Sequence, residues 1–372
     1  PGSEYSVMKI AYIIADFGIP VHGNKGASIH VRELSQALMD LGHDVRIFTP
    51  RLGGDAPADF HVPATEIKPE KSDKSTVSTL QDDPAAGDPM AKEIRGLLYA
   101  TSMRHRLSDC FKDWQPDAIY ERYSLLATAG TELAHELGIP HILEVNAPLS
   151  KEAAEHRGLK LRHTAEALER RILNATSHVI AVSEPIRQWA GSMGVAADNA
   201  SVMPNGVNIA RFADAKPAPS AALETDDRPV VGFVGTLKAW HGTPMLIRSM
   251  GLIARIRGKA NTPRLLIVGD GPQRELLQQL AVEEGIDDLT LFTGSVPHEE
   301  IAAWIARMDI AVAPYDDLQN FYFSPLKVYE YMAAGKAIVA SNIGQITECL
   351  THQANGLLYQ PGNVTSLADQ IM

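Results

Sequence analysis

The feature that most constrains the fold of this chain is a regular alternation of short apolar runs with amphipathic stretches. An apolar run at residues 10–15 precedes apolar residues at helical spacing over 29–38, and a second run covers 45–49. Strand, helix and strand within about forty residues make a βαβ unit, whose two strands are parallel. Helical stretches then connect further expected strands at 118–120, 141–145 and 179–182.

The same alternation begins again after a break near residue 206. A loop rich in Ala, Pro, Ser and Asp runs to residue 227, and apolar runs follow at 229–234, 265–268, 290–292, 310–313 and 337–340. The length of 372 residues agrees with two domains at about 150 residues each. We therefore predict two doubly wound α/β domains, residues 8–205 and 206–372, that face each other across a ligand-binding cleft.

Composition excludes several other classes of protein. The 34 basic and 45 acidic residues give a net charge of −11, which argues against a broad basic face for nucleic acid. Two cysteines cannot form a disulfide framework or a cysteine-based zinc site. No uncharged apolar run approaches the ~18 residues of a membrane span. Residues 1–7 look like an expression remnant. We expect a cytoplasmic protein without a transmembrane segment, for which peripheral membrane contact stays open.

Two polar stretches of the first half also carry expectations. Residues 52–90 are rich in Pro, Asp, Ala, Ser and Lys and show little periodicity, which predicts a long, partly mobile surface insertion. This insertion is either an acceptor-facing loop or a variable excursion. The helix expected over 161–172 carries Glu166 and Glu169 beside two arginines, and we expect these charges on a solvated face.

Glycine-rich turns follow the first strand of the first array and the second strand of the second array. Gly23 and Gly26 would let backbone N–H groups approach an anion, and the helix N-terminus adds about half a positive charge. A tight turn that needs glycine explains this loop equally well. The turn at Gly269 and Gly271 lacks the third glycine of the dinucleotide fingerprint, so no nicotinamide or flavin cofactor is expected. No D-x-D pair or histidine spacing indicates a metal site.

The most informative segment runs from Asn320 to Gly335. Pro325 suits the first turn of a helix that Gly335 ends, so first-turn N–H groups would be free for an anion beside Lys327. Glu330 follows on about the same side of the helix, where its carboxylate can accept two hydrogen bonds from a vicinal diol such as a ribose. These residue types predict a nucleoside diphosphate pocket. The alternative is an ordinary amphipathic helix with an exposed Lys and Glu.

The order of these motifs resembles that of the family-4 retaining glycosyltransferases of the GT-B fold. The matching series covers nearly the whole chain and consists of the glycine loop with His30-Val31-Arg32-Glu33-Leu34, Leu41-Gly42-His43-Asp44-Val45, Ala181-Val182-Ser183-Glu184, Pro204-Asn205-Gly206-Val207-Asn208, Phe233-Val234-Gly235-Thr236-Leu237, Val268-Gly269-Asp270-Gly271-Pro272 and Asn355-Gly356-Leu357-Leu358. The resemblance implies a Rossmann-like acceptor-side domain followed by a nucleotide-sugar domain. Relatives usually end in a helix that crosses back to the first domain, which we expect to be missing here.

The resemblance also assigns the donor site. The family's hallmark is two glutamates, of which Glu330 matches the second, the ribose-binding one, while Tyr322 replaces the first. The Ser-Pro-Leu-Lys segment resembles a branch of the family that does without the first glutamate. Backbone at Gly294 and Val296 is expected around the base. The residues expected at the donor diphosphate are Gly26, Thr236, Lys238, His241, Ser324, Pro325, Leu326 and Lys327.

Two departures from the family pattern change the expected charges. Thr236 and His241 stand where the family usually has Arg and Lys. Losing two cations would weaken diphosphate binding, so we expect Lys327, and secondarily Lys238, to replace them while His241 donates a hydrogen bond. Asn146 stands where many members have His in the first domain. It fits a front-face retaining mechanism, in which the leaving diphosphate takes the acceptor's proton.

The resemblance thus implies a hexosyltransferase of glycan biosynthesis that moves a sugar from a nucleoside diphosphate sugar, expected to be a UDP-sugar, to a hydroxyl acceptor without a metal or other cofactor. Asn146, Lys327 and Glu330 are the expected catalytic residues. Weaker candidates for acceptor contacts are Glu144, Lys151, Glu152 and Arg122, the last of which suits a solvated surface arginine equally well. A nucleotide-sugar epimerase of the same fold and a non-catalytic glycosyltransferase-like subunit remain as alternatives.

Overall fold

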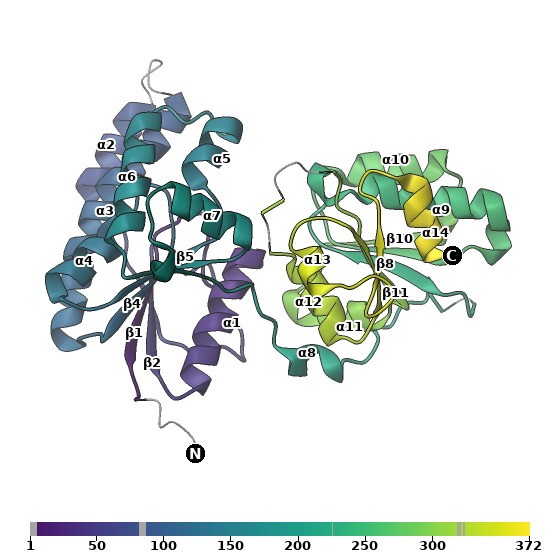
Figure 1. The fold of residues 1–372 in the computed structure, drawn as a ribbon, viewed down its shortest axis with the longest axis horizontal. Helices are drawn as coiled ribbons and strands as arrows, with labels where there is room; N and C mark the ends of the chain where they lie inside the picture. Colours follow the sequence, from purple (N-terminus) through teal and green to yellow (C-terminus); the bar gives the residue numbers. More distant parts are fainter. Residues whose placement is uncertain (1–5, 82–86, 225, 318–320, 323) are drawn as a thin grey trace. The chain divides into compact units, whose positions relative to one another are not determined.

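A computed structural model describes residues 6–81, 87–224, 226–317, 321–322 and 324–372 of the chain. The chain forms two compact units, Pro1–Pro204 and Asn205–Met372, each with its own parallel sheet (Figure 1). They are called unit 1 and unit 2 below. None of the described helices combines the length and the apolar character that a membrane crossing needs.

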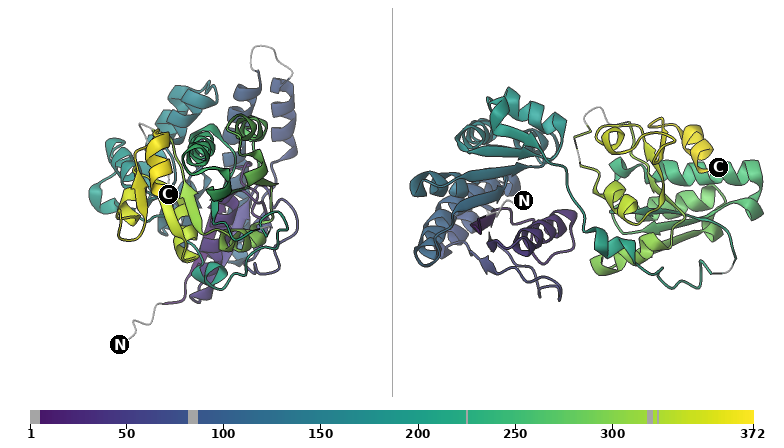
Figure 2. Two further views of the ribbon diagram at one scale, coloured as in Figure 1. Left: turned by 90° about the vertical axis from the view of Figure 1, so that its right-hand side faces the viewer. Right: turned by 60° about the horizontal axis from the view of Figure 1, so that its bottom comes forward.

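Unit 1 contains a seven-stranded parallel sheet in the order β3-β2-β1-β4-β5-β6-β7. Its strands are β1 (Lys9–Ile14), β2 (Asp44–Thr49), β3 (Ala64–Glu66), β4 (Ala118–Arg122), β5 (His141–Val145), β6 (His178–Ala181) and β7 (Ala200–Val202). Its helices are α1 (Gly26–Asp40), α2 (Lys71–Gln81), α3 (Gly87–Asp113), α4 (Ala129–Leu137), α5 (Leu149–His156), α6 (Arg162–Ala175), α7 (Glu184–Ser192) and η1 (Ala197–Asn199). They lie on both faces of the sheet (Figures 1 and 2).

Unit 2 contains a six-stranded parallel sheet in the order β10-β9-β8-β11-β12-β13. Its strands are β8 (Val230–Val234), β9 (Arg264–Val268), β10 (Thr290–Gly294), β11 (Ile310–Ala313), β12 (Ala337–Ser341) and β13 (Leu357–Tyr359). Its helices are α8 (Ile209–Ala213), η2 (Ala239–His241), α9 (Thr243–Arg257), η3 (Lys259–Asn261), α10 (Arg274–Glu283), η4 (Asp287–Leu289), α11 (His298–Ala306), α12 (Leu326–Ala333), α13 (Ile346–Cys349) and α14 (Val364–Ile371).

Residues of the central strands alternate between two cores, which explains why helices cover both faces of each sheet. In β1, Ile10, Tyr12 and Ile14 pack into one buried cluster, whereas Ala11 and Ile13 pack into a second one. Successive strand residues point to opposite faces, so a strand that is buried on both faces is a continuous apolar run in the sequence. The doubly wound α/β fold predicted from these runs is confirmed.

In both sheets the strand order reverses at one place, which we call the switch point. It lies between β1 and β4 in unit 1 and between β8 and β11 in unit 2. The loops that leave neighbouring strands here turn to opposite faces of the sheet, and the crevice outside their carboxyl ends is where such sheets bind ligands. The switch point of each unit is therefore the first place to look for a functional site.

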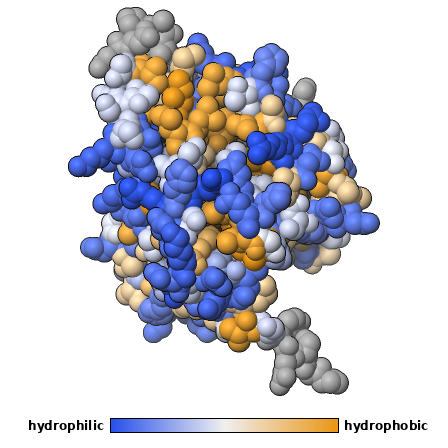
Figure 3. Space-filling model, turned by 90° about the vertical axis from the view of Figure 1, so that its left-hand side faces the viewer, coloured by the Kyte–Doolittle hydropathy of each residue, from blue (hydrophilic) through white to orange (hydrophobic). Residues whose placement is uncertain are grey.

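The segment 52–90 differs from its prediction as an insertion without regular structure. It contains β3, α2 and the beginning of α3, while its residues 82–86 lie outside the described part of the chain. Phe60 and Val62 are buried in the core beside β1 and β2, and Val77 is the buried residue of α2. So few buried residues on short elements leave little periodicity in the sequence. On the face shown in Figure 3, hydrophobic residues gather beside the grey residues that join α2 to α3.

Candidate functional site

The candidate site of unit 2 is built from the loops at its switch point. Gly235 and Thr236 follow β8, Tyr315 follows β11 shortly before α12, and η2 turns into α9 at Gly242. Gly242 has a φ of +63°, and a Cβ there would overlap the carbonyl oxygen of Pro314. Only glycine therefore allows the η2 turn to pack against the end of β11.

Lys327 places a buried ammonium group at this switch point. The residue is 8% exposed, and Nζ lies 4.2 Å from the centre of the Phe233 ring and 4.9 Å from that of Tyr315. Among the described residues Nζ has no hydrogen-bond partner. Burial lowers the pKa of Lys327 to about 7, and the nearby Glu330 offsets part of this effect. Because an unpaired buried charge is costly, the geometry suits an anionic ligand that would supply the missing partner.

Glu330 lies one helical turn after Lys327 on α12. It is half-buried, and its side chain makes no hydrogen bond or ion pair within the described part of the chain. Burial raises its pKa to about 7, although the charge of Lys327 acts in the opposite direction. The oxygens of the Glu330 carboxylate are therefore free to accept hydrogen bonds, and a cation lies nearby. Such an arrangement can bind a diol that is attached to a phosphate group.

The start of α12 differs in two respects from what the sequence predicted. The alternative of an exposed lysine is wrong, because Lys327 is buried. The expectation of free first-turn N–H groups is wrong for Leu326 and Val328, which donate to the carbonyl oxygens of Ser324 (2.9 Å) and Pro325 (2.8 Å). Pro325 precedes the helix and so closes a tight turn. These two backbone N–H groups are used within the turn, whereas the Lys327 ammonium group has no hydrogen-bond partner among the described residues.

His241 lies beside this cation in a neutral state. Its Nδ1 is 2.5 Å from the carbonyl oxygen of Thr236, which can only accept, so Nδ1 carries the proton. Burial, together with the charge of Lys327, lowers the pKa of His241 to about 3. Its Nε2 is then an acceptor, and the ring must take up a proton before it can donate to a phosphate. Lys238 places its Nζ 4.7 Å from the ring centre of the exposed Trp240.

The residues expected around the base lie at the end of β10. Gly294 is buried with a φ of +75°, and its carbonyl oxygen accepts a 3.0 Å hydrogen bond from the N–H of Gly269. A Cβ at Gly269 would in turn overlap the carbonyl oxygen of Gly235. Val296 is half-buried against the core. The glycines thus bring the ends of β8, β9 and β10 together, which places the predicted base-side residues on the same sheet edge as Lys327.

In unit 1, a buried carboxylate gathers four donors at the ends of β4 and β5. Glu144 is 1% exposed and accepts hydrogen bonds from His30 (2.8 Å), Tyr120 (2.8 Å), Arg122 (2.5 Å) and Asn146 (2.5 Å). Burial would raise its pKa, but the charges of His30 and Arg122 hold it well below its usual range. Glu144 uses all four of its acceptor positions within the described residues and so holds its neighbours in fixed orientations.

The neighbours of Glu144 correct one prediction and add two residues. The Arg122 side chain is 11% exposed and paired, so the alternative of a solvated arginine is wrong. Asn146 donates through Nδ2, and its Oδ1 makes no hydrogen bond within the described residues. Sequence reasoning missed His30 and Tyr120 as part of this network. The signal for Tyr120 was strand alternation, since it lies on the same face of β4 as Arg122, which pairs in register with Glu144.

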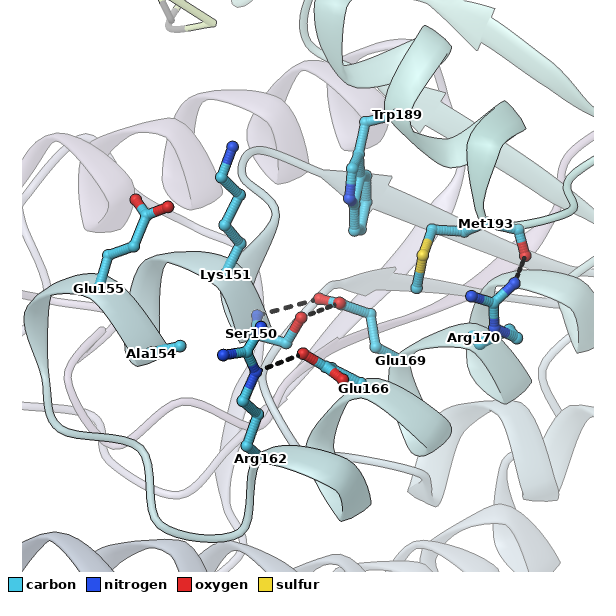
Figure 4. Close-up of a pocket in the computed structure, with 10 residues that line it drawn as sticks. All are labelled: Ser150, Lys151, Ala154, Glu155, Arg162, Glu166, Glu169, Arg170, Trp189 and Met193. Carbon is cyan, nitrogen blue, oxygen red and sulfur yellow. Dashed lines mark hydrogen bonds and ion pairs between the residues drawn. The ribbon is translucent and has the colours of Figure 1, made fainter.

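The remaining predicted residues lie at different places in unit 1. Gly26 begins α1, and no atom lies within 4 Å of where its Cβ would be, so the start of this helix is open to a ligand. Glu152 on α5 pairs with Arg157 at 3.1 Å. Lys151 lines a pocket of about 400 Å³ among α5, α6 and α7 (Figure 4). The structure thus separates Lys151 from the Glu144 network.

The pocket in Figure 4 also shows that Glu169 is not on a solvated face. Its carboxylate is 1% exposed and accepts hydrogen bonds from the hydroxyl of Ser150 and from Tyr123 (3.0 Å). Burial raises the pKa of Glu169. Glu166, three residues earlier, has a side chain that is 41% exposed and pairs with Arg162 at 2.8 Å. The prediction is therefore wrong for Glu169 and confirmed for Glu166, because the helix turns only one of the two toward α5.

Comparisons with known proteins agree with this architecture. Residues 24–211 match the family described as Glycosyltransferase Family 4, and residues 228–372 match Glycosyl transferases group 1. The D-inositol 3-phosphate glycosyltransferase of Pseudarthrobacter chlorophenolicus is 26% identical over 358 residues, which cover 92% of this chain and 80% of that protein.

Solved structures share the fold over almost the whole chain. Sucrose-phosphate synthase from Thermosynechococcus elongatus gives a TM-score of 0.69 at 22% identity and covers 98% of this chain and 88% of that one. Anabaena HepE in complex with UDP and glucose gives a TM-score of 0.67 at 18% identity, with 97% and 88% covered. Within the described residues, no group of three or more His, Cys, Asp or Glu side chains is placed to hold a metal ion.

Proposed function

This chain is a glycosyltransferase of family 4 with the two-domain GT-B fold, and on that basis we propose that it transfers a sugar from a UDP-sugar to a hydroxyl acceptor with retention of anomeric configuration. Unit 2 binds the donor and unit 1 binds the acceptor. The choice of UDP is supported by HepE, a protein of similar fold solved with UDP and glucose.

One observation carries the proposal: Lys327 and Glu330 are an unpaired cation and an unpaired carboxylate one helical turn apart at the switch point of unit 2. A nucleoside diphosphate has a phosphate group and a ribose diol that match these two groups. Lys327 would bind the diphosphate and Glu330 the ribose. Burial of the two side chains strengthens both interactions, because the local dielectric is low.

The proposed reaction breaks the bond between C1 of the sugar and the β-phosphate oxygen. The acceptor oxygen forms its new bond to C1 on the same face, and its proton passes to the departing diphosphate. Lys327 stabilises the charge that develops on that diphosphate, which is usually the largest catalytic contribution. Asn146 Oδ1 accepts from the acceptor hydroxyl and so orients it. We propose that the reaction proceeds without a divalent metal, with Lys327 supplying positive charge at the leaving group.

A panel of nucleotide sugars tests this function. The protein is incubated with UDP-glucose, UDP-galactose, UDP-N-acetylglucosamine, GDP-mannose and ADP-glucose, with and without an acceptor extract and with and without EDTA. We expect acceptor-dependent release of UDP that EDTA does not reduce, and an unchanged anomeric configuration by NMR. An isomerised donor without acceptor would identify an epimerase, and binding without turnover would identify a non-catalytic subunit.

The variant Glu330→Ala ties the activity to the site. We expect its donor KM to rise sharply or transfer to be lost, while Glu348→Ala, an exposed glutamate on α13, stays near wild type. Near-wild-type kinetics of Glu330→Ala would contradict the assignment.

A further inference from the structure

We infer that unit 1 recognises an acceptor that carries an anionic oxygen group, a phosphate or a carboxylate, and that Arg95 binds this group. The inference rests on the proposed function, because it names the chemical class of the acceptor in that reaction. It starts from a pocket that none of the sequence motifs indicated.

The pocket has a volume of about 360 Å³ and lies at the switch point of unit 1. Its lining comes from residues 15–18, which follow β1, from residues 124–127, which follow β4, from α3, and from α5 and the residues directly after it. Ser124 donates to the carbonyl oxygen of Arg122 at 3.3 Å, so the pocket begins beside the Glu144 network.

Arg95 presents an unused guanidinium group to this pocket. Its guanidinium carbon lies 4.5 Å from the centre of the Phe17 ring, and Phe17 packs against the buried Tyr99 at 4.8 Å. Within the described residues Arg95 makes no hydrogen bond or ion pair, and its buried Nε has no partner. The contact with the Phe17 ring holds the guanidinium in place. The N–H groups of the planar guanidinium can donate two parallel hydrogen bonds to the oxygens of a phosphate or a carboxylate.

Among the described residues, the acidic side chains of the pocket lining make no ion pair with Arg95. Asp16 accepts a 2.6 Å hydrogen bond from the N–H of Gly18, and the two oxygens of Glu93 hold the N–H groups of residues 160 and 161 at 2.8 and 2.6 Å. Lys92 adds a further cation to the lining. The lining therefore carries both signs of charge, and the feature that favours an anion is the unused guanidinium of Arg95.

Part of the pocket lining is apolar, and one of its residues has an unusual backbone conformation. This part is formed by Leu125, Leu126, Ala127, Ala153 and Leu159. Leu126 has a φ of +68°, a conformation that a leucine rarely adopts and that occurs preferentially at ligand-binding sites. The Arg95 cation and the apolar lining residues together suit a sugar-like ring that carries hydroxyl groups and one anionic group.

Calorimetric titration with three matched sugars, in the absence of nucleotide, tests the inference. Glucose 6-phosphate, glucuronate and glucose share a ring and differ in the charged group. We expect at least one of the two anions to bind at least tenfold more tightly than glucose. The phosphate and carboxylate arms identify which group is recognised.

Variants then locate the binding. The variant Arg95→Met should lower the affinity for the anionic sugar at least tenfold, and Arg95→Lys should recover part of this affinity. Arg104→Met, on the same helix but paired with Glu136 at 2.6 Å on the surface, should bind as wild type does. Thermal unfolding checks that each variant is folded. Equal affinity of Arg95→Met, or no preference of the protein for either anion over glucose, would overturn the inference.

A UDP titration keeps this result separate from the proposed function. If the protein binds UDP but not the anionic sugars, only the inference about the acceptor class is contradicted. If it does not bind UDP, the proposed donor site in unit 2 is contradicted.

Discussion

Glu144 in unit 1 and Lys327 in unit 2 are both buried charges at the ends of strands in their sheets, but they differ in how they are satisfied. Glu144 in unit 1 accepts four hydrogen bonds, and its pKa is well below the usual range. Lys327 in unit 2 has no hydrogen-bond partner, and burial lowers its pKa to about 7. A fully bonded charge is part of the folded framework, whereas an unbonded one is set up for a ligand. This difference, and not burial alone, separates a positioning residue from a binding residue.

The largest expected effect concerns the framework side of this comparison. Glu144→Ala leaves Arg122 buried without its partner, so we expect the free energy of unfolding to fall by about 3–5 kcal/mol. Urea denaturation of the wild type and the variant measures this loss. Glu166→Ala, which removes an exposed carboxylate, should leave the denaturation midpoint unchanged. A Glu144→Ala variant as stable as the wild type would show that the network is not a structural unit.

The second prediction concerns pH and the ligand side of the comparison. In the free protein Lys327 loses its proton as the pH rises through about 7, so affinity for UDP should fall by about tenfold between pH 7 and pH 9. Glu330, whose pKa burial raises to about 7, is half ionised at pH 7 and ionised at pH 9, so its titration favours the ribose contact as the pH rises and opposes the expected decline. Calorimetry over the pH series measures the slope. An equally steep decline in Lys327→Met would assign the titration to another group.

The smallest effect is on stability, and its sign is opposite to that of Glu144. The folded pKa of Lys327 lies below the value of 10.5 for an unperturbed lysine, so the unfolded chain binds more protons between about pH 7 and 10.5. Stability rises with pH across that window, and below it the charged ammonium costs free energy. Lys327→Met should therefore be as stable as the wild type at pH 6, or more stable by about 1 kcal/mol. If urea denaturation shows that Lys327→Met is markedly less stable than the wild type, Lys327 has a structural role instead of a ligand-binding one.

The parts of the fold that the sequence predicted are those buried on both faces. Residues 141–145 and 310–313 were predicted as strands with the bounds that β5 and β11 have. The three-residue strands β3, β7 and β13 were missed, because each is only partly buried and short strands carry too few apolar residues to form a pattern. The same reason explains why the structure of segment 52–90 was not predicted.

The candidate site divides along similar lines. Lys327 and Glu330 were predicted because both lie on one short helix after a recognisable turn, so their spacing is visible in the sequence. The contacts of Lys327 with Phe233 and Tyr315, and those of Glu144 with His30, join residues that are far apart in the chain. Only the strand order brings these residues together. Arg95 was missed for this reason too, since its ring contact comes from the loop after β1.

The most direct test of the account is a calorimetric titration of UDP at pH 7 into three proteins: the wild type, Lys327→Met and Lys238→Met. The two variants remove the same charge, one buried and unpaired at the switch point and the other beside the exposed Trp240. The account predicts a loss of affinity of at least tenfold for Lys327→Met, since charge-assisted hydrogen bonds contribute about 1.5–3 kcal/mol, and a much smaller change for Lys238→Met. Equal UDP affinity of Lys327→Met and wild type would contradict it.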